Sequence, residues 1–190
     1  MDDTRRGVRP KRCSAAFWLM VCLTPAVFAC GLGGPSSDEL PTPVSTGPDS
    51  SITLSKGPCY GTCQEFSLII SGRGALRWIG RRYVTVVGER RSAINPAQVD
   101  AIFASLDAVR FDNWFVGPRS KARPQNVEAD GTIHVVLESK IDAPETRLTV
   151  RRRGISRAVT YVYPPPALVP VEMQMLNLGD VREWLARPKR

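Results

Sequence analysis

The chain of 190 residues contains a single histidine, His134, and this scarcity limits the chemistry that the chain can support. Zinc hydrolase centres combine several histidine or cysteine ligands, and a serine-type triad needs a histidine beside its nucleophile. A hydrolytic active site could therefore be built only around His134, with Asp130 or Asp142 as its acidic partner. Glu138 could also pair with His134, although paired polar residues are common on exposed strand faces. No glycine-rich phosphate loop leads from an expected strand into a helix, so the sequence predicts no catalytic residue and no cofactor.

Cysteine is also scarce, and its placement separates the N-terminus from the rest of the chain. The five cysteines are Cys13, Cys22, Cys30, Cys59 and Cys63. Positively charged residues within 5–12 precede an almost uncharged apolar run at 13–29, which is shorter than the ~20 apolar residues of a stable membrane span. A basic start followed by a short apolar run is typical of an export signal.

The end of this run, Val27-Phe28-Ala29-Cys30, resembles the lipobox of bacterial lipoproteins. The resemblance implies that residues 1–29 are a signal peptide and that Cys30 receives a diacylglycerol and an N-terminal acyl chain such as palmitate. Membrane lipid is then the first expected partner. Gly31 takes the place of the aspartate that retains many lipoproteins on the inner membrane, which favours the outer membrane. An ordinary signal peptide and an uncleaved anchor, with Cys30 incidental in both, stay open as alternatives.

Residues 30–51 are rich in glycine, proline, serine and threonine and contain few large apolar side chains. Such a composition cannot bury enough surface to offset the entropy of ordering, so we expect a flexible tether. Residues 52–187 have a length suited to one domain with its own core.

The net charge of +8 is strongly basic. Five of the 26 Lys and Arg residues and two of the 18 Asp and Glu residues precede Cys30, so the rest of the chain has a net charge of +5. A basic domain suggests nucleic acid, but an exported domain seldom meets it and no nucleic-acid-binding motif is visible. We expect no nucleic acid. Another envelope protein or an acidic envelope polymer is a candidate partner, and a merely solvated surface is the simplest interpretation.

Alternating apolar residues in the first half of the domain predict four strands, at residues 52–54, 65–71, 75–79 and 83–87. Glycine-containing turns separate the last three, which indicates an antiparallel meander. Asn95 is a good N-cap and Pro96 suits the first helical position. Val99, Ile102, Phe103 and Leu106 recur at helical spacing and predict one buried helix face.

The second half predicts a surface loop at residues 117–129 and then a hairpin of strands at 132–138 and 146–152. A short strand at 159–163 and a final amphipathic helix at 171–186, weakened by Gly179, follow. The expected fold class is α+β, with an antiparallel sheet of about five to seven strands and two helices packed on one side.

The segment Cys59-Tyr60-Gly61-Thr62-Cys63-Gln64-Glu65-Phe66 resembles the opening motif of an uncharacterised bacterial family, domain of unknown function 6438. That motif reads Cys-aromatic-Gly-x-Cys-Pro-x-aromatic, so Gln64 stands at the usual proline position. Asp130 and Trp184 resemble later family positions, and the resemblance covers roughly residues 52–185. It implies an exported or lipid-anchored protein and brings no established activity.

Three chemistries are open to Cys59 and Cys63. Export favours a structural disulfide, because nearby thiols are normally oxidised outside the cytosol. A thiol–disulfide exchange centre would use Lys56 as a nearby cation, but the pair precedes a strand and lacks a helix dipole. A Cu(I) site would combine both thiolates with His134. We expect a lipid-anchored, non-enzymatic binding or structural domain held by a Cys59–Cys63 disulfide, with no bound metal. The alternative is a thiol-redox or Cu(I)-handling protein, and the sequence does not indicate the binding residues.

Overall fold

The computed structural model describes residues 47–115, 125–140 and 142–186. The predicted signal peptide, the predicted lipidation site Cys30 and residues 31–46 of the predicted tether lie outside the described residues. Ile141, residues 117–124 of the predicted surface loop and Arg187 of the predicted domain also lie outside them.

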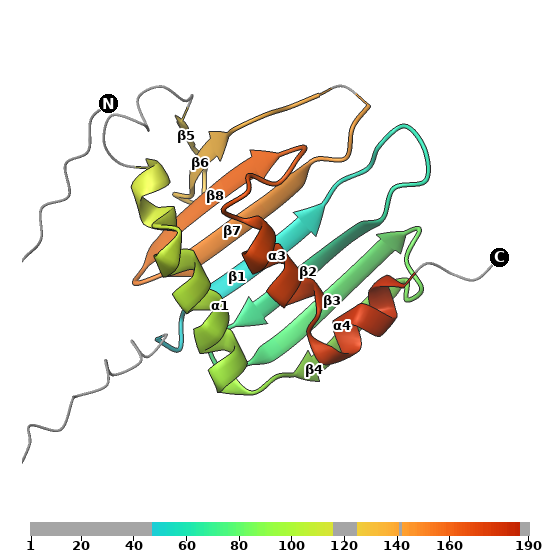
Figure 1. Ribbon diagram of the computed structural model, residues 1–190, viewed down its shortest axis with the longest axis horizontal. Helices are drawn as coiled ribbons and strands as arrows, with labels where there is room; N and C mark the ends of the chain where they lie inside the picture. Colours follow the sequence, from blue (N-terminus) through green and yellow to red (C-terminus); the bar gives the residue numbers. More distant parts are fainter. Residues whose placement is uncertain (1–46, 116–124, 141, 187–190) are drawn as a thin grey trace, which may run out of the picture. The chain divides into compact units, whose positions relative to one another are not determined.

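Eight strands form one sheet, in the spatial order β4-β3-β2-β1-β7-β8-β6-β5 (Figure 1). Their bounds are β1 Ser51–Lys56, β2 Glu65–Ser71, β3 Ala75–Arg82, β4 Gly88–Ala93, β5 Gln125–Val127, β6 Ile133–Val136, β7 Thr146–Arg152 and β8 Ile155–Tyr161. Neighbouring strands are antiparallel, except for β6 and β8, which are parallel. The class is α+β with a mostly antiparallel sheet.

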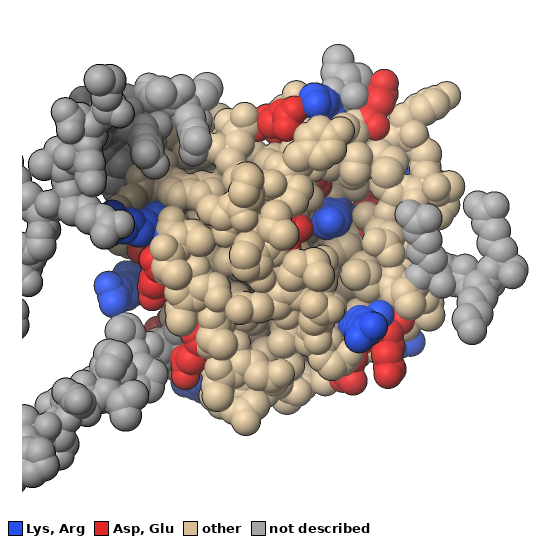
Figure 2. Space-filling model, viewed as in Figure 1, with Lys and Arg blue, Asp and Glu red and all other residues tan. Residues whose placement is uncertain are grey.

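Three α-helices of the described residues lie across one face of the sheet (Figure 1). They are α1 Pro96–Ala108, α3 Val169–Leu176 and α4 Gly179–Leu185, and the 3-10 helix η1 Phe111–Phe115 follows α1. Seen from this side, charged side chains lie mostly toward the margins of the described surface (Figure 2). Within the described residues, no helix combines the length and the apolar composition that a bilayer crossing requires.

The core lies between the helices and the sheet, because successive strand residues point to opposite faces. On β2, Phe66, Leu68 and Ile70 are fully buried toward the helices. Trp78 on β3 stacks on Phe66 with ring centroids 4.7 Å apart, and Trp184 of α4 lies 6.1 Å from Trp78. These aromatic contacts join the C-terminal helix to the middle of the sheet.

Helix α1 begins and packs as its sequence predicts. The Asn95 side chain accepts a hydrogen bond from the backbone N–H of Ala97, and the side chain of Gln98 accepts one from the backbone N–H of Asn95. This capping box satisfies amide groups that a helix start leaves free. The buried residues of α1 are the four predicted ones, Val99, Ile102, Phe103 and Leu106.

The strand predicted at residues 83–87 is wrong, and the strand that pairs with β3 is β4, immediately after it. Tyr83 has a positive φ of 56°, which a strand does not allow. Val84 is buried and the Val86 carbonyl accepts a hydrogen bond of 2.9 Å from Trp78 Nε1, so this segment folds back on the core. Its apolar residues serve tertiary contacts rather than strand alternation.

The predicted hairpin of residues 132–138 and 146–152 is also wrong. The strand β6 pairs with β8 in parallel, with His134 opposite Ala158 and Val136 opposite Thr160. The true hairpin joins β7 to β8 through Arg153 and Gly154, both of which have positive φ. With β5, which falls in the predicted loop, the sheet has eight strands rather than five to seven.

The predicted final helix is two helices, so three α-helices rather than two cover the sheet within the described residues. Leu178 adopts an extended conformation, with φ −61° and ψ 131°, between α3 and α4. The break places Leu178 and Val181 in the core at 5% and 0% exposure. Gly179 at this point lowers the cost of interrupting the helix.

Candidate functional site

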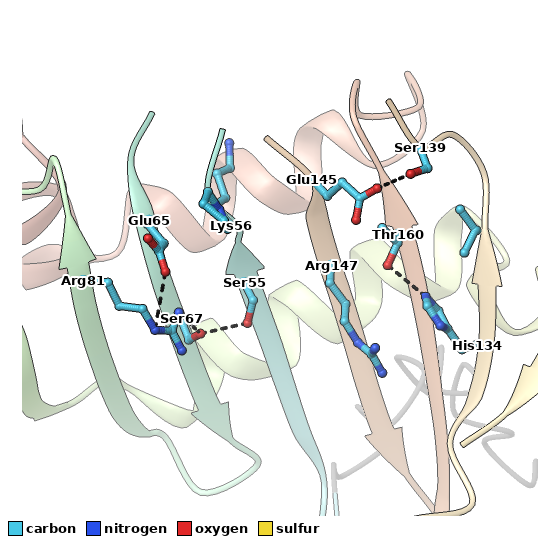
Figure 3. A pocket seen from close by; sticks show the side chains of 13 residues that line it. Ser55, Lys56, Glu65, Ser67, Arg81, His134, Ser139, Glu145, Arg147 and Thr160 are labelled. Atoms are coloured by element: carbon cyan, nitrogen blue, oxygen red, sulfur yellow. Dashed lines mark hydrogen bonds and ion pairs between the residues drawn. The ribbon is translucent and has the colours of Figure 1, made fainter. Parts of the chain in front are cut away.

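The face of the sheet that the helices leave uncovered carries a hollow of about 510 Å³ (Figure 3). Its lining comes from six strands and from the loops after β1 and β6, and most of the residues that line it are polar. The lining residues are Ser55, Lys56, Gly57, Pro58, Glu65, Ser67, Arg81, His134, Val136, Ser139, Glu145, Arg147 and Thr160. We call this hollow the open-face pocket.

The first polar group of the pocket is centred on Ser67 of β2. Ser67 is only 7% exposed, and its hydroxyl accepts hydrogen bonds from the Ser55 hydroxyl at 3.0 Å and from Arg81 Nη1 at 3.3 Å. The Nε of Arg81 lies 3.9 Å from Glu65 Oε1. Strands β1, β2 and β3 thus present hydroxyl, guanidinium and carboxylate groups side by side, joined by hydrogen bonds and one long ion pair (Figure 3).

The second polar group is centred on His134 of β6. Its Nε2 lies 2.8 Å from the hydroxyl of Thr160 on β8, and its Nδ1 lies 3.1 Å from Glu128 Oε1. The other oxygen of Glu128 accepts a hydrogen bond of 2.6 Å from Arg147 Nη2. Thr160 is 6% exposed, and the His134 side chain is 14% exposed. Four side chains thus form one continuous chain of contacts.

The electrostatics of this chain fix the state of the imidazole. Burial lowers the pKa of His134 and the nearby Arg147 lowers it further, so the ring is neutral at pH 7. The hydrogen bond from Arg147 lowers the pKa of Glu128, which keeps that carboxylate ionised. A neutral ring beside a carboxylate carries its proton on Nδ1 and donates it to Glu128. The Nε2 atom then accepts the hydrogen bond of the Thr160 hydroxyl.

The acidic residues predicted as partners of His134 lie elsewhere. Asp130 accepts a hydrogen bond of 2.9 Å from the backbone N–H of Thr132, and the Asp142 carbonyl accepts a long one of 3.4 Å from the N–H of Tyr60. Glu138 pairs with Lys140 at 2.8 Å. Glu128 was not predicted as a partner of His134, because the two meet only through the pairing of β5 with β6. That pairing, which places Asn126 opposite His134, has no signal in the sequence.

Cys59 and Cys63 form a disulfide in the loop between β1 and β2, with their Cα atoms 5.8 Å apart. The same loop is anchored at its start, where the Gly57 N–H donates to the Glu145 carbonyl at 2.8 Å. Gln64 anchors its end, because its Nε2 donates to the carbonyl of Leu185 in α4 at 2.7 Å. This loop therefore forms a fixed wall of the open-face pocket through Gly57 and Pro58.

Cys59, Cys63 and His134, the predicted ligands of the alternative Cu(I) site, each contact other partners. The two sulfurs are bonded to each other, and His134 contacts Glu128 and Thr160. In residues 47–115, 125–140 and 142–186, no group of three or more His, Cys, Asp and Glu side chains is placed to hold a metal ion. The described residues thus bring together a polar pocket rather than a soft-metal site.

Lys56 connects the pocket to the helix layer behind it. Its Nζ lies 4.0 Å from Glu172 Oε2 of α3, and Glu172 is 6% exposed. The hydroxyl of Tyr161 donates to the other oxygen of Glu172, and burial together with this carboxylate raises the pKa of Tyr161. The Glu172 carboxylate therefore has both a cation and a hydroxyl as partners, as a buried acid requires.

Comparison with known proteins adds one finding. A family model described as Domain of unknown function (DUF6438) matches residues 50–178, which include every lining residue of the open-face pocket. None of the curated proteins matches the chain. The matched range covers more than half of the sequence, and the chain belongs to the DUF6438 family.

Proposed function

We propose that this protein is exported, is anchored to a bacterial envelope membrane through acylated Cys30, and acts there as a non-enzymatic binding module. The support for the anchor is the sequence of residues 1–30, with its basic start, short apolar run and lipobox-like end. The support for binding is the open-face pocket, a polar hollow beside a disulfide-held loop. Concave sites with convergent polar groups are the usual places where proteins bind small ligands.

The anchor is tested with the full-length chain in a bacterial host grown with labelled palmitate. We expect label on the wild-type protein and recovery in the membrane fraction. The Cys30→Ser variant should lose both, whereas the Cys13→Ser variant should keep both. Label and membrane attachment that survive in Cys30→Ser would contradict the lipid anchor.

A second candidate function is ester hydrolysis, and the contacts of His134 are the observation that favours it. A nucleophile, a base and an acid in hydrogen-bond reach are the signature of nucleophilic catalysis. Thr160 Oγ1 would attack an ester carbonyl and give its proton to His134 Nε2, which would return the proton to the leaving alcohol. Water would then release the acid from Thr160. Against this function, Arg147 draws on the charge of Glu128 and makes the imidazole a weaker base.

The two functions separate in an assay with p-nitrophenyl acetate. The binding module predicts no acetyl group on Thr160 by mass spectrometry and the same rate of ester cleavage in wild type and Thr160→Val. Hydrolysis that depends on Thr160 and leaves a transient acetyl adduct there would replace the binding function by the enzymatic one.

A further inference from the structure

The lining of the open-face pocket sets the character of its ligand. Ligand pockets are usually lined mostly by apolar and aromatic side chains. Here Pro58 and Val136 are the large apolar side chains, and hydroxyls and charged groups supply most of the rest. A hydrophobic ligand would leave these groups without the hydrogen bonds that water gives them, at a cost for each buried group. The ligand must itself be rich in hydrogen-bonding groups.

The charges of the pocket disfavour a strongly anionic ligand. Each of its three cations already has an acidic partner: Arg81 has Glu65 at 3.9 Å, Arg147 has Glu128 at 2.6 Å, and Lys56 has Glu172 at 4.0 Å. Glu145 adds a further carboxylate to the lining. A phosphate or an acidic polymer would meet no surplus of positive charge and would face these carboxylates. An uncharged polar ligand avoids that repulsion.

The two polar groups repeat the same chemistry along the sheet. One presents Arg81, Glu65 and Ser67 to the pocket. The other presents His134, Thr160 and Arg147, and the hydrogen-bonded pair of Ser139 and Glu145 lies beside it (Figure 3). Guanidinium donates and carboxylate accepts, so each group suits a molecule whose hydroxyls do both. The strands of Arg81 and Arg147 are three steps apart in the sheet, about 14 Å at the usual spacing. This separation fits a chain of several polyhydroxyl units better than a single one.

An exposed aromatic ring lies in the loop between β1 and β2, whose first residues, Gly57 and Pro58, line the pocket. Tyr60 is 90% exposed and lies two residues after Pro58, between the two cysteines of the disulfide. A tyrosine offers an apolar ring face and a polar tip. The C–H face of a sugar ring packs on such a surface. The disulfide and the anchored loop ends hold Tyr60 before any ligand arrives, which reduces the entropy lost on binding.

We propose that the open-face pocket binds an uncharged oligosaccharide segment, with Tyr60 of the adjoining loop packing on one sugar and the two polar groups hydrogen-bonding the hydroxyls of others. This inference rests on the binding function proposed above and names the ligand class of that site. An uncharged stretch of envelope glycan is the ligand that this chemistry recognises.

The test uses the full-length protein in detergent and isothermal titration calorimetry. The probes are neutral β-1,4-linked N-acetylglucosamine oligomers and the acidic polymer polygalacturonate. We expect the neutral oligomers to bind, with an affinity that changes little between low and high salt. Tyr60→Ala should weaken this binding by about tenfold, and Arg81→Gln should weaken it as well. The control is Tyr83→Ala, since Tyr83 is also an exposed tyrosine, at 40%, but lies in the segment between β3 and β4 rather than in the disulfide loop.

Each other outcome overturns a defined part of the proposal. Salt-sensitive binding of polygalacturonate alone would keep the binding function and overturn the uncharged ligand. Wild-type affinity in Tyr60→Ala and Arg81→Gln, with circular dichroism spectra unchanged, would remove the pocket as the glycan site. Binding of neither probe would overturn the glycan inference, and the palmitate experiment would still decide the lipid anchor by itself.

Discussion

The two faces of the sheet are built from the same strands, yet they differ in composition and in what they support. On β2, Phe66 and Leu68 point to the helices and are fully buried, while Ser67 between them points to the open-face pocket. On β8, Val159 and Tyr161 are in the core, and Thr160 contacts His134 on the other face. The helix-covered face therefore supplies the apolar burial that stabilises the fold, and the open face supplies hydrogen-bonding groups that the core cannot use.

The largest expected difference between the faces is in stability. Phe66→Ala removes a fully buried ring stacked on Trp78 and should lower the free energy of unfolding by about 3–5 kcal/mol. Ser67→Ala, one residue away on the other face, removes hydrogen bonds to Ser55 and Arg81 and should cost about 1 kcal/mol. Urea unfolding of both variants measures the contrast. Equal losses would mean that the open face carries as much of the stability as the core.

The second largest effect is expected at Gly80, where the core leaves no room for a side chain. A Cβ atom at Gly80 would collide with the Val86 carbonyl oxygen and with Trp78 Nε1, two atoms that are hydrogen-bonded to each other. Gly80→Ala should therefore lower stability by about 2–3 kcal/mol, as overpacking does elsewhere. Gly88→Ala is the comparison, because nothing lies near its Cβ position, although its φ of 91° adds strain. Thermal unfolding followed by tryptophan fluorescence measures the stability of both variants. A smaller loss of stability in Gly80→Ala than in Gly88→Ala would contradict the close packing.

The disulfide lies in the loop between β1 and β2, whose first residues, Gly57 and Pro58, line the pocket. Closing so short a loop contributes about 2 kcal/mol, so the Cys59→Ser, Cys63→Ser double variant should lose about that much. Glycan affinity should fall as well, because the loop that carries Tyr60 is no longer fixed. Intact mass with and without reductant measures the bond itself. Rapid exchange with mild thiols would support the redox alternative instead of a structural disulfide.

The smallest expected effect comes from His134 on the open face. Its pKa is below the ordinary 6.5 because it is buried and lies near Arg147. As the pH falls below 6.5, His134 takes up a proton in the unfolded chain before it does so in the folded protein. The free energy of unfolding therefore decreases. His134→Gln should reduce the drop in melting temperature between pH 7 and pH 5. An unchanged drop would show that groups other than His134 account for it.

Sequence patterns predicted the elements whose signals are local. The strand at 65–71 follows from alternation, and helix α1 follows from Asn95, Pro96 and the spacing of its apolar residues. The pairing of β6 with β8 could not be predicted, since no local pattern indicates which distant strand will be the neighbour. The residues at 83–87 were mistaken for a strand, because Val84 and Val86 are apolar for packing on the core and not for strand alternation.

The candidate site was predictable only in its parts. The rarity of histidine singled out His134, and the short spacing of Cys59 and Cys63 indicated their disulfide. The partner Glu128 and the opposed sets around Arg81 and Arg147 depend on strand order. From Arg81 to Arg147 the sheet runs through β3, β2, β1 and β7. The first three are consecutive along the chain, whereas β1 and β7 pair across a long stretch of sequence. Side chains that meet through strand order become visible only once that order is known.

The position of β8 has a consequence for how the chain reaches its final state. This strand lies between β7 and β6 in the sheet, although both precede it in the sequence. During synthesis from N- to C-terminus, β5 and β6 therefore emerge before the strand that joins them to the sheet. Nonlocal contacts of this kind slow folding. The half of the pocket that contains His134 can assemble only after residue 161 has emerged, so the completion of β8 determines when the site exists.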